Sequence, residues 1–441
     1  MSIIAILTTD QIQALTTATL AALTTDDIRA FTTAQMVALT TAQVPSFTTS
    51  QLPAFTTAQL AAMETADVVV LTTNQLRALA STQAAALTTA QVANLTTAQA
   101  AGLATTQIAG LTSTQTAALT TAQAAALSST QIASLSTNAV KGLTTAGIAA
   151  FDTAQIKGLA SAQIAALSTA QVAAIETADL AAMTTAQIPG FAAAGIAAMT
   201  TAQVANLTTA QIRALTSTQA PALTTAHIAA ITTAQVAGLT TAQIAGLAST
   251  QIVGLSTAQL TAVTTAQVAG LGTAQLNALS STQLAAMTTA QLGQFTTTQL
   301  GGISTTGVKG LTTAQLAALT TAQITGLGTG QIGALSTTQV AAIETADLAT
   351  LTTAQLRAFS TGQLSGLGTA QVVALTTAQV VALSTAQMVG FRTAQVAVLT
   401  TAQVAALETA DIAALSTTQT GAFTTSQLAA MSAGQLNAIF L

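Results

Sequence analysis

The hydrophobic and polar positions of the chain repeat every eight residues, in 54 octads that run from Thr8 to Ile439 without an insertion or deletion. Counted from Thr400 in TTAQVAAL, position 8 is a large apolar residue in every octad, and position 5 is apolar and larger than Ala in 48. Position 4 is Gln in 43 octads, and position 2 is Thr or Ser in 52. Large apolar residues three apart, set among Ala and Gln, favour a helix, because a strand would point them to opposite faces.

Each octad also carries the signal of a helix start. Thr400 and Gln403 have the spacing of a capping box, in which each side chain hydrogen-bonds the backbone amide of the other residue. All twelve acidic residues lie at positions 1, 3 or 4, and seven of the eight basic residues lie at position 6, as a helix dipole favours. Position 6 is therefore expected to face water. It also carries the four prolines, which a long helix would not tolerate: Pro45, Pro53, Pro189 and Pro221.

One continuous helix is excluded by geometry. Eight residues rotate by about 800°, so positions 5 and 8 of successive octads would share no face of a straight helix. We expect the chain to bend at positions 7 and 8. Position 7 is a small residue in 50 octads and holds 14 of the 27 glycines, including Gly102 and Gly142. These glycines indicate either left-handed C-caps or close approach between neighbouring helices.

The predicted fold is an all-α solenoid of 54 very short helices, one per octad, with positions 5 and 8 inside and position 6 outside. One octad buries too little apolar surface to fold alone, so its stability must come from stacking on neighbours. We expect residues 1–7 to form an apolar lead, residues 8–439 one uninterrupted solenoid and residues 440–441 an apolar end. A weaker repeat of 168 residues, seen from Ser136 to Ser304, reflects either block duplication or a superhelical period.

Composition narrows the classes of function. Only 5% of the residues are charged and the net charge is −4, so the chain offers no basic surface for nucleic acid. It has no Cys, which excludes disulfides and thiolate chemistry. Thr and Gln interrupt every apolar run, so no membrane-spanning helix is expected. The start MSIIAIL lacks the basic region of a cleaved signal peptide. We nevertheless expect an extracellular or cell-surface location, since this composition suits a protein outside a bacterial cell.

A few substitutions within the octads are candidates for chemistry. Every Glu is followed three residues later by an Asp, which places two carboxylates on one helix face. Such a pair, helped by backbone oxygens, is a candidate calcium site. Descent from one ancestral octad and favourable placement at a helix N-terminus explain the same pairs. The pairs are Glu64 with Asp67, Glu176 with Asp179, Glu344 with Asp347, and Glu408 with Asp411.

The remaining substitutions do not predict an active site. His227, the single histidine, stands where Gln usually stands and is expected to replace its capping hydrogen bond. We expect neither a cofactor nor an enzyme, because unlike groups do not converge at any one place along the pattern. The Thr-Thr pairs would form a regular array of hydroxyls. That array fits either an ice-binding face or caps and corners of the helices.

The two ends of the chain are apolar, which suggests end-to-end self-association. The residues concerned are Ile3, Ile4, Ile6, Leu7, Ile439, Phe440 and Leu441. We therefore predict a non-enzymatic structural protein whose elongated rods assemble with themselves into an extracellular fibre, a surface layer or a biofilm matrix scaffold. The alternative is a surface-binding module that contacts ice, polysaccharide or another surface through its Thr-lined flank.

Two resemblances accompany this pattern. The segment from Leu375 to Leu383, LTTAQVVAL, is similar to the opening helix of TAL-effector repeats, but the second helix, the base-reading loop and the 34-residue period are missing. This resemblance therefore implies a Thr N-cap and a Gln at the third helical position, and no DNA binding. All 54 octads together resemble the LTTAQ-type octapeptide-repeat proteins of bacteria. That resemblance implies a secreted, adhesin-like role at the cell surface.

Overall fold

A computed structural model describes residues 2–440, and within them each of the 54 octads forms one short helix. Fifty octads form an α-helix, and the four octads with a proline at position 6 form a 3₁₀-helix, labelled η. The described part of the chain contains no strand. The predicted all-α solenoid with one helix per octad is therefore confirmed.

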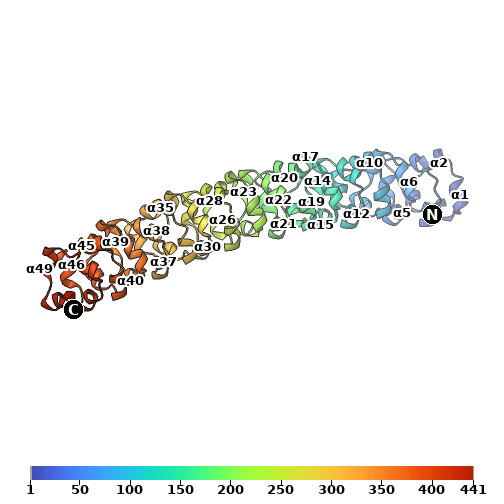
Figure 1. The fold of residues 1–441 in the computed structure, drawn as a ribbon. Helices are drawn as coiled ribbons and strands as arrows, with labels where there is room; N and C mark the ends of the chain where they lie inside the picture. The colour runs from blue at the N-terminus through green and yellow to red at the C-terminus, as the bar shows by residue number, and fades with distance from the viewer. Residues whose placement is uncertain (1, 441) are drawn as a thin grey trace. The chain divides into compact units, whose positions relative to one another are not determined.

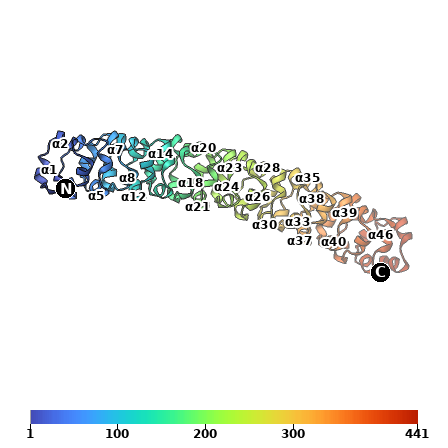
Figure 2. The ribbon, with the colours of Figure 1, turned by 180° about the vertical axis from the view of Figure 1, so that it is seen from behind.

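The helices group into two compact units, of which the first ends at Leu223 and the second starts at Thr224. Within each unit the helices follow one another in chain order (Figures 1 and 2). The same octad builds both units. That residues 8–439 form a single uninterrupted solenoid stays a prediction.

The first unit contains η1 (Ile3–Ile6), α1 (Thr9–Gln13), α2 (Thr17–Ala21), α3 (Thr25–Arg29), α4 (Thr33–Ala38), η2 (Val44–Ser46), η3 (Leu52–Ala54), α5 (Thr57–Ala62), α6 (Thr65–Val70), α7 (Thr73–Ala78), α8 (Ser81–Ala84), α9 (Thr89–Asn94), α10 (Thr97–Gly102), α11 (Thr105–Ala109), α12 (Ser113–Ala118), α13 (Thr121–Ala126), α14 (Ser129–Ser134), α15 (Thr137–Gly142), α16 (Thr145–Ala149), α17 (Thr153–Gly158), α18 (Ser161–Ala166), α19 (Thr169–Ala174), α20 (Thr177–Ala182), η4 (Ile188–Gly190), α21 (Ala193–Ala198), α22 (Thr201–Asn206), α23 (Thr209–Ala214) and η5 (Ala220–Ala222).

The second unit contains α24 (Thr225–Ala230), α25 (Thr233–Gly238), α26 (Thr241–Gly246), α27 (Ser249–Val253), α28 (Thr257–Ala262), α29 (Thr265–Ala269), α30 (Thr273–Ala278), α31 (Ser281–Ala286), α32 (Thr289–Leu292), α33 (Thr297–Gly301), α34 (Thr305–Val308), α35 (Thr313–Ala317), α36 (Thr321–Thr325), α37 (Thr329–Ala334), α38 (Thr337–Ala341), α39 (Thr345–Thr350), α40 (Thr353–Arg357), α41 (Thr361–Ser365), α42 (Thr369–Ala374), α43 (Thr377–Val381), α44 (Thr385–Val389), α45 (Thr393–Ala397), α46 (Thr401–Ala406), α47 (Thr409–Ala413), α48 (Thr417–Thr420), α49 (Thr425–Ala430) and α50 (Ala433–Phe440).

The predicted capping box starts the α-helices. At α46 the Thr400 hydroxyl accepts a hydrogen bond from the Gln403 amide at 3.1 Å, and the Gln403 side-chain oxygen accepts one from the Thr400 amide at 2.8 Å. The two bonds satisfy amides that have no partner inside the helix. The same reciprocal pair recurs in most octads, for example at Thr32 and Gln35.

The chain bends at positions 8 and 1, and not at positions 7 and 8 as expected. Leu407 ends α46 with φ −59° and ψ 141°, and Thr400 precedes it with φ −70° and ψ 154°. Both residues are extended, as β-region angles are usual for an N-cap residue such as Thr400. Position 7, in contrast, keeps a helical conformation in most octads. Two extended residues between successive helices therefore make each corner.

The glycines at position 7 allow close packing between helices. No residue in the range 2–440 has a positive φ, so the left-handed C-cap is excluded there. A Cβ atom added to Gly102 would overlap the Thr73 side chain, and one added to Gly142 would overlap the Ser113 carbonyl oxygen. Of the two interpretations of these glycines, close approach is the correct one.

Helices that are three octads apart lie against each other, as α12 and α15 do. Hydrogen bonds from glutamine side chains join octads that are four apart, since Gln403 reaches Leu375, 28 residues earlier. One coil of the solenoid therefore holds between three and four octads, or about 3.5. The sequence alone did not give this number.

The core of each unit consists of positions 5 and 8, as predicted. In α46, Val404 is fully buried and Leu407 is 4% exposed. The phenylalanines at position 8 are buried as well, and the rings of Phe31, Phe47 and Phe55 make edge-to-face contacts. Position 6 faces outward. A proline there removes an amide that the α-helix uses, so these octads retain only a turn and a short 3₁₀-helix.

Candidate functional site

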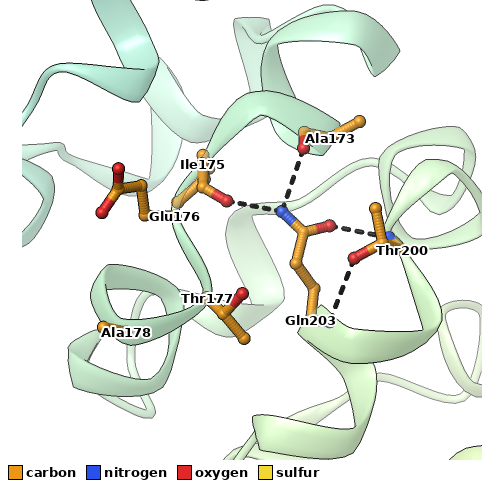
Figure 3. Close-up of a pocket in the computed structure, with 7 residues that line it drawn as sticks. All are labelled: Ala173, Ile175, Glu176, Thr177, Ala178, Thr200 and Gln203. Carbon is orange, nitrogen blue, oxygen red and sulfur yellow. Dashed lines mark hydrogen bonds between the residues drawn. The ribbon is translucent and has the colours of Figure 1, made fainter.

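The polar group that recurs in the interior is the glutamine at position 4. Gln203, which is 2% exposed, donates from Nε2 to the carbonyl oxygens of Ile175 at 2.7 Å, Val172 at 3.1 Å and Ala173 at 3.3 Å. Its Oε1 atom accepts from the Thr200 amide at 2.7 Å. Figure 3 shows the carboxamide lying between its own helix start and the end of the helix four octads earlier. One side chain thus caps a helix and fastens two coils together.

We call this arrangement the glutamine bridge. Every position-4 glutamine from Gln35 onward is buried, whereas Gln11, which has no coil before it in the structure, is exposed. Such a bridge satisfies a helix-start amide and the position-8 carbonyl group, which would otherwise lack partners, and gives the position-5 carbonyl group a second donor. Sequence analysis found the capping half of this role and missed the other half. The available signal was that Glu, which also serves in capping boxes, never stands at position 4.

Two surface hollows lie beside such bridges. One, of about 410 Å³, is lined by Ala173, Ile175, Glu176, Thr177, Ala178, Thr200 and Gln203 (Figure 3). The other, of about 400 Å³, lies at the equivalent place beside Glu408 and Gln435. The polar atoms of Gln203 and Gln435 are already used in bridges. The hollows therefore repeat a feature of the octad and do not bring unlike reactive groups together.

The four Glu–Asp pairs place one acid outside and one inside. In each pair the Glu is the exposed N-cap residue and makes no capping hydrogen bond, while the Asp at position 4 is buried. Asp179 and Asp347 each accept a hydrogen bond at 2.7 Å, from the hydroxyls of Thr153 and Thr321. Groups of three or more His, Cys, Asp or Glu side chains that could hold a metal do not occur in residues 2–440. Calcium binding by these pairs stays a prediction.

Asp67 differs from the other buried acids. It is 1% exposed, and its Oδ2 atom has no hydrogen-bond partner. Burial, which strips the charged carboxylate of its hydration, and to a lesser extent the negative charge of Glu64 together raise the pKa of Asp67 from 3.8 to about 6. Asp67 is therefore the most perturbed acid of the described chain.

His227 has the role that the sequence predicted. Its Nδ1 atom accepts a hydrogen bond from the Thr224 amide at 3.1 Å, and its own amide donates to the Thr224 hydroxyl at 3.2 Å. The side chain is 3% exposed. The imidazole thus takes the place of a glutamine in a capping box.

The predicted apolar ends are only partly exposed. Ile3 is 66%, Ile6 72% and Phe440 82% exposed. Ile4 is 2% exposed and adds little to an apolar end surface. Self-association through these residues stays a prediction. Leu7 and Ile439 are half-buried. Leu441, the last residue of the predicted set, lies outside the described residues.

Comparison with known families decides the identity of the octad. The model of the ALTTAQ repeat matches well over half of the chain. The chain belongs to the ALTTAQ repeat family. The matches cover residues 4–41, 20–57, 60–97, 148–174, 172–209, 196–225, 204–233, 252–289, 269–297, 285–321, 297–329, 310–342, 340–377, 372–409 and 404–439. The predicted LTTAQ-type repeat is confirmed. No curated protein matches this ALTTAQ repeat chain. Across residues 2–440, no helix has the length and apolar character needed to cross a membrane.

Proposed function

We propose that this ALTTAQ repeat protein is a non-enzymatic scaffold whose stacked coils form an elongated rod outside the cell, in a fibre, a surface layer or a biofilm matrix. The glutamine bridge is the observation that supports this proposal most. Its acceptors are backbone carbonyl oxygens, which every octad has, so an octad of any sequence in the preceding coil can accept these hydrogen bonds. Octads can therefore be added or removed without a change in contact chemistry, and the number of octads sets the length of the rod.

The distribution of polar groups supports the same function. The polar atoms of the repeated glutamines are used inside the solenoid, and the outward positions carry mostly Ala, Thr and few charges. Tandem repeats whose side-chain chemistry hardly varies suit a mechanical role better than recognition of one small molecule. The extracellular location rests on composition and on the resemblance to bacterial surface proteins.

A deletion tests the rod directly. Removal of residues 352–407 takes out seven whole octads, which correspond to two coils at 3.5 octads per coil. We expect the variant to stay helical and its maximum dimension to fall by about 20 Å, since packed helices lie 8–10 Å apart. Circular dichroism and small-angle X-ray scattering measure the two effects.

A control deletion of residues 352–403 removes 52 residues, which is not a whole number of octads, and leaves a broken octad at the junction. We expect this shorter deletion to cause the larger loss of thermal stability, because glutamines after the junction lose their register with the carbonyl groups. Equal stability of the two variants, or a maximum dimension that does not change with the number of octads, would refute the rod.

The exposed Ile3, Ile6 and Phe440 support end-to-end association of such rods. Electron microscopy of the purified protein is expected to show filaments that lengthen with concentration, and Ile6→Lys together with Phe440→Lys is expected to leave short particles. Filaments that are unaffected by both substitutions would place the contact elsewhere.

A surface-binding module is the second candidate, and the threonines favour it. The position-1 hydroxyls are used as caps, but position-2 threonines such as Thr401 lie exposed in octad after octad. A regular row of exposed hydroxyls suits ice or polysaccharide. Thermal hysteresis and pull-down on insoluble polysaccharides test this function, and negative results in both assays would remove it.

A further inference from the structure

The octad of residues 64–71 lacks the donor of the glutamine bridge, and no other group replaces it. Asp67 occupies position 4 there and is almost completely buried, with the Oδ2 atom unpartnered. Leaving a buried acceptor without a partner costs free energy, and a buried charge costs more. A native structure that retains such an acceptor suggests that a positively charged species completes the site.

The register of the bridge shows what Asp67 faces. Gln59, one octad earlier, donates to the carbonyl oxygens of Ile28 and Phe31, which are 31 and 28 residues before it. By the same register, a glutamine at position 67 would reach the carbonyl groups of Met36 and Leu39, at the end of α4. These two carbonyl groups therefore receive no side-chain amide from Asp67.

The end of α4 is short of donors in a second, independent respect. In most octads the position-8 amide donates to the position-5 carbonyl oxygen, as Met63 does to Leu60 at 3.3 Å. At the end of α4 the Leu39 amide makes no such bond to Met36. The Met36 carbonyl thus lacks both of its usual donors. The end of α4 and the start of α6 therefore both present acceptors without donors: the Met36 and Leu39 carbonyl oxygens and the Asp67 carboxylate.

Two of the other three buried acids avoid this situation. Asp179 and Asp347 are each held by a threonine hydroxyl 26 residues earlier. The equivalent residue for Asp67 is Thr41, which belongs to the Pro45 octad, and no hydrogen bond joins it to Asp67. In that octad the proline has replaced the α-helix by η2.

The length of the side chain favours a cation over a proton. Asp is one methylene shorter than Gln, by about 1.5 Å, and the glutamine nitrogen lies 2.8 to 2.9 Å from its carbonyl acceptors at Gln59. A carboxylate oxygen at this position therefore stands on the order of 4 Å from the carbonyl oxygens, beyond hydrogen-bond distance. Oxygen ligands with this spacing suit Ca²⁺, which takes carboxylate and backbone oxygens at about 2.3–2.6 Å.

We propose that Asp67, Glu64 and the carbonyl groups of Met36 and Leu39 form a calcium site that takes the place of one glutamine bridge. Glu64 lies exposed at the N-cap of α6 without a capping bond, so its carboxylate is available to the ion. Calcium would join α4 and α6 as the carboxamide joins the coils elsewhere. This proposal does not depend on the scaffold function.

Hydrogen exchange of the full chain tests the site where it lies. With CaCl₂ at ten times the Kd, we expect amide exchange in residues 36–39 and 64–71 to slow by about tenfold relative to EDTA. MgCl₂ at the same ionic strength is the salt control, because Mg²⁺ demands a tighter octahedral shell. Asp67→Gln restores the donor and is expected to give slow exchange in both conditions, with no further effect of calcium.

Asp347→Gln is the matched control, because Asp347 already has a hydroxyl partner, and it should leave the calcium effect at residues 36–39 and 64–71 unchanged. The proposal is overturned if calcium has no effect on the natural chain, or has the same effect on Asp67→Gln. The proposal is also overturned if exchange slows in EDTA only on acidification and does not respond to calcium. That result would mean that a proton, and not calcium, neutralises Asp67.

Discussion

Two stretches of the solenoid use the same octad with different polar joints. Residues 352–407 carry Gln at position 4 in all seven octads, and each of these glutamines bridges to the coil before it, as Gln379 does to Leu348 and Leu351. Residues 136–199 lack Gln in four of eight octads, at Ala139, Gly147, Asp179 and Gly195. Both stretches bury positions 5 and 8 equally. The apolar pair therefore specifies the coil, and the bridge adds stability and register to it.

Residues 136–199, called here the weaker stretch because they have fewer glutamine bridges, have replacements for some of the missing bridges. At Ala139 the buried hydroxyl of Thr116 donates to the Ala139 carbonyl oxygen at 2.6 Å. In the same octad Gly142 lets the backbone approach Ser113 closely. At Asp179 the bond from Thr153 links the coils. Two of the four losses are thus answered by a hydroxyl from the preceding coil, as expected when each repeat contacts only its near neighbours.

The largest effect is expected when the donating carboxamide of a glutamine bridge is replaced by a carboxylate, which repels the carbonyl acceptors. Gln379→Glu keeps the shape and the capping bond from the Thr376 amide, but it places a carboxylate oxygen against the Leu348 and Leu351 carbonyl groups. An uncompensated buried charge costs about 3–5 kcal/mol. Urea unfolding at pH 7 measures the loss in free energy of unfolding.

The matched control for this substitution is Gln11→Glu. Gln11 has the same capping bond from Thr8 but is exposed, with no coil before it, so we expect a change below about 0.5 kcal/mol. A loss at Gln11 as large as that at Gln379 would show that the bridge between coils is not the cause.

The second effect concerns Asp67, where a bridge is absent and an acid is buried. Its folded pKa of about 6 lies above the ordinary 3.8, so the folded chain binds the proton more tightly than the unfolded chain. The stabilisation is complete below pH 3.8 and is lost as the pH rises through 6. In EDTA the loss between pH 4 and pH 7 is about 2 kcal/mol for the octad of residues 64–71.

Hydrogen exchange in α6 as a function of pH measures this loss. The raw rates are corrected for the intrinsic pH dependence of exchange. Asp67→Asn removes the titrating group and is expected to give a flat profile over the same range. A sloping profile that survives in Asp67→Asn would mean that another group carries the pH dependence.

Local features of this fold were predictable from the sequence, and the distant ones were not. The capping box of Thr400 and Gln403 is a contact over three residues, so spacing alone reveals it. The bond from Gln403 to Leu375 spans 28 residues and depends on how many octads close a coil, which no local pattern states. The unpartnered oxygen of Asp67 was equally out of reach, because the groups that would pair with it belong to earlier coils, about 26 to 31 residues away.

The smallest effect is expected from adding a bridge to the weaker stretch. Gly147→Gln places a carboxamide in register with the carbonyl groups of Thr116 and Leu119. The closest atoms to a Cβ at Gly147 are the Thr144 hydroxyl at 3.2 Å and the Ala124 Cβ at 3.5 Å, so a side chain fits after a small shift of that hydroxyl. Gly147→Ala measures the helix-propensity gain alone, about 1 kcal/mol. The bridge should add about 1 kcal/mol beyond that alanine variant, measured by urea unfolding. Equal stability of the Gln and Ala variants would show that the coils around Gly147 have a register that a glutamine does not fit. The two stretches would then differ in backbone geometry as well as in side chains.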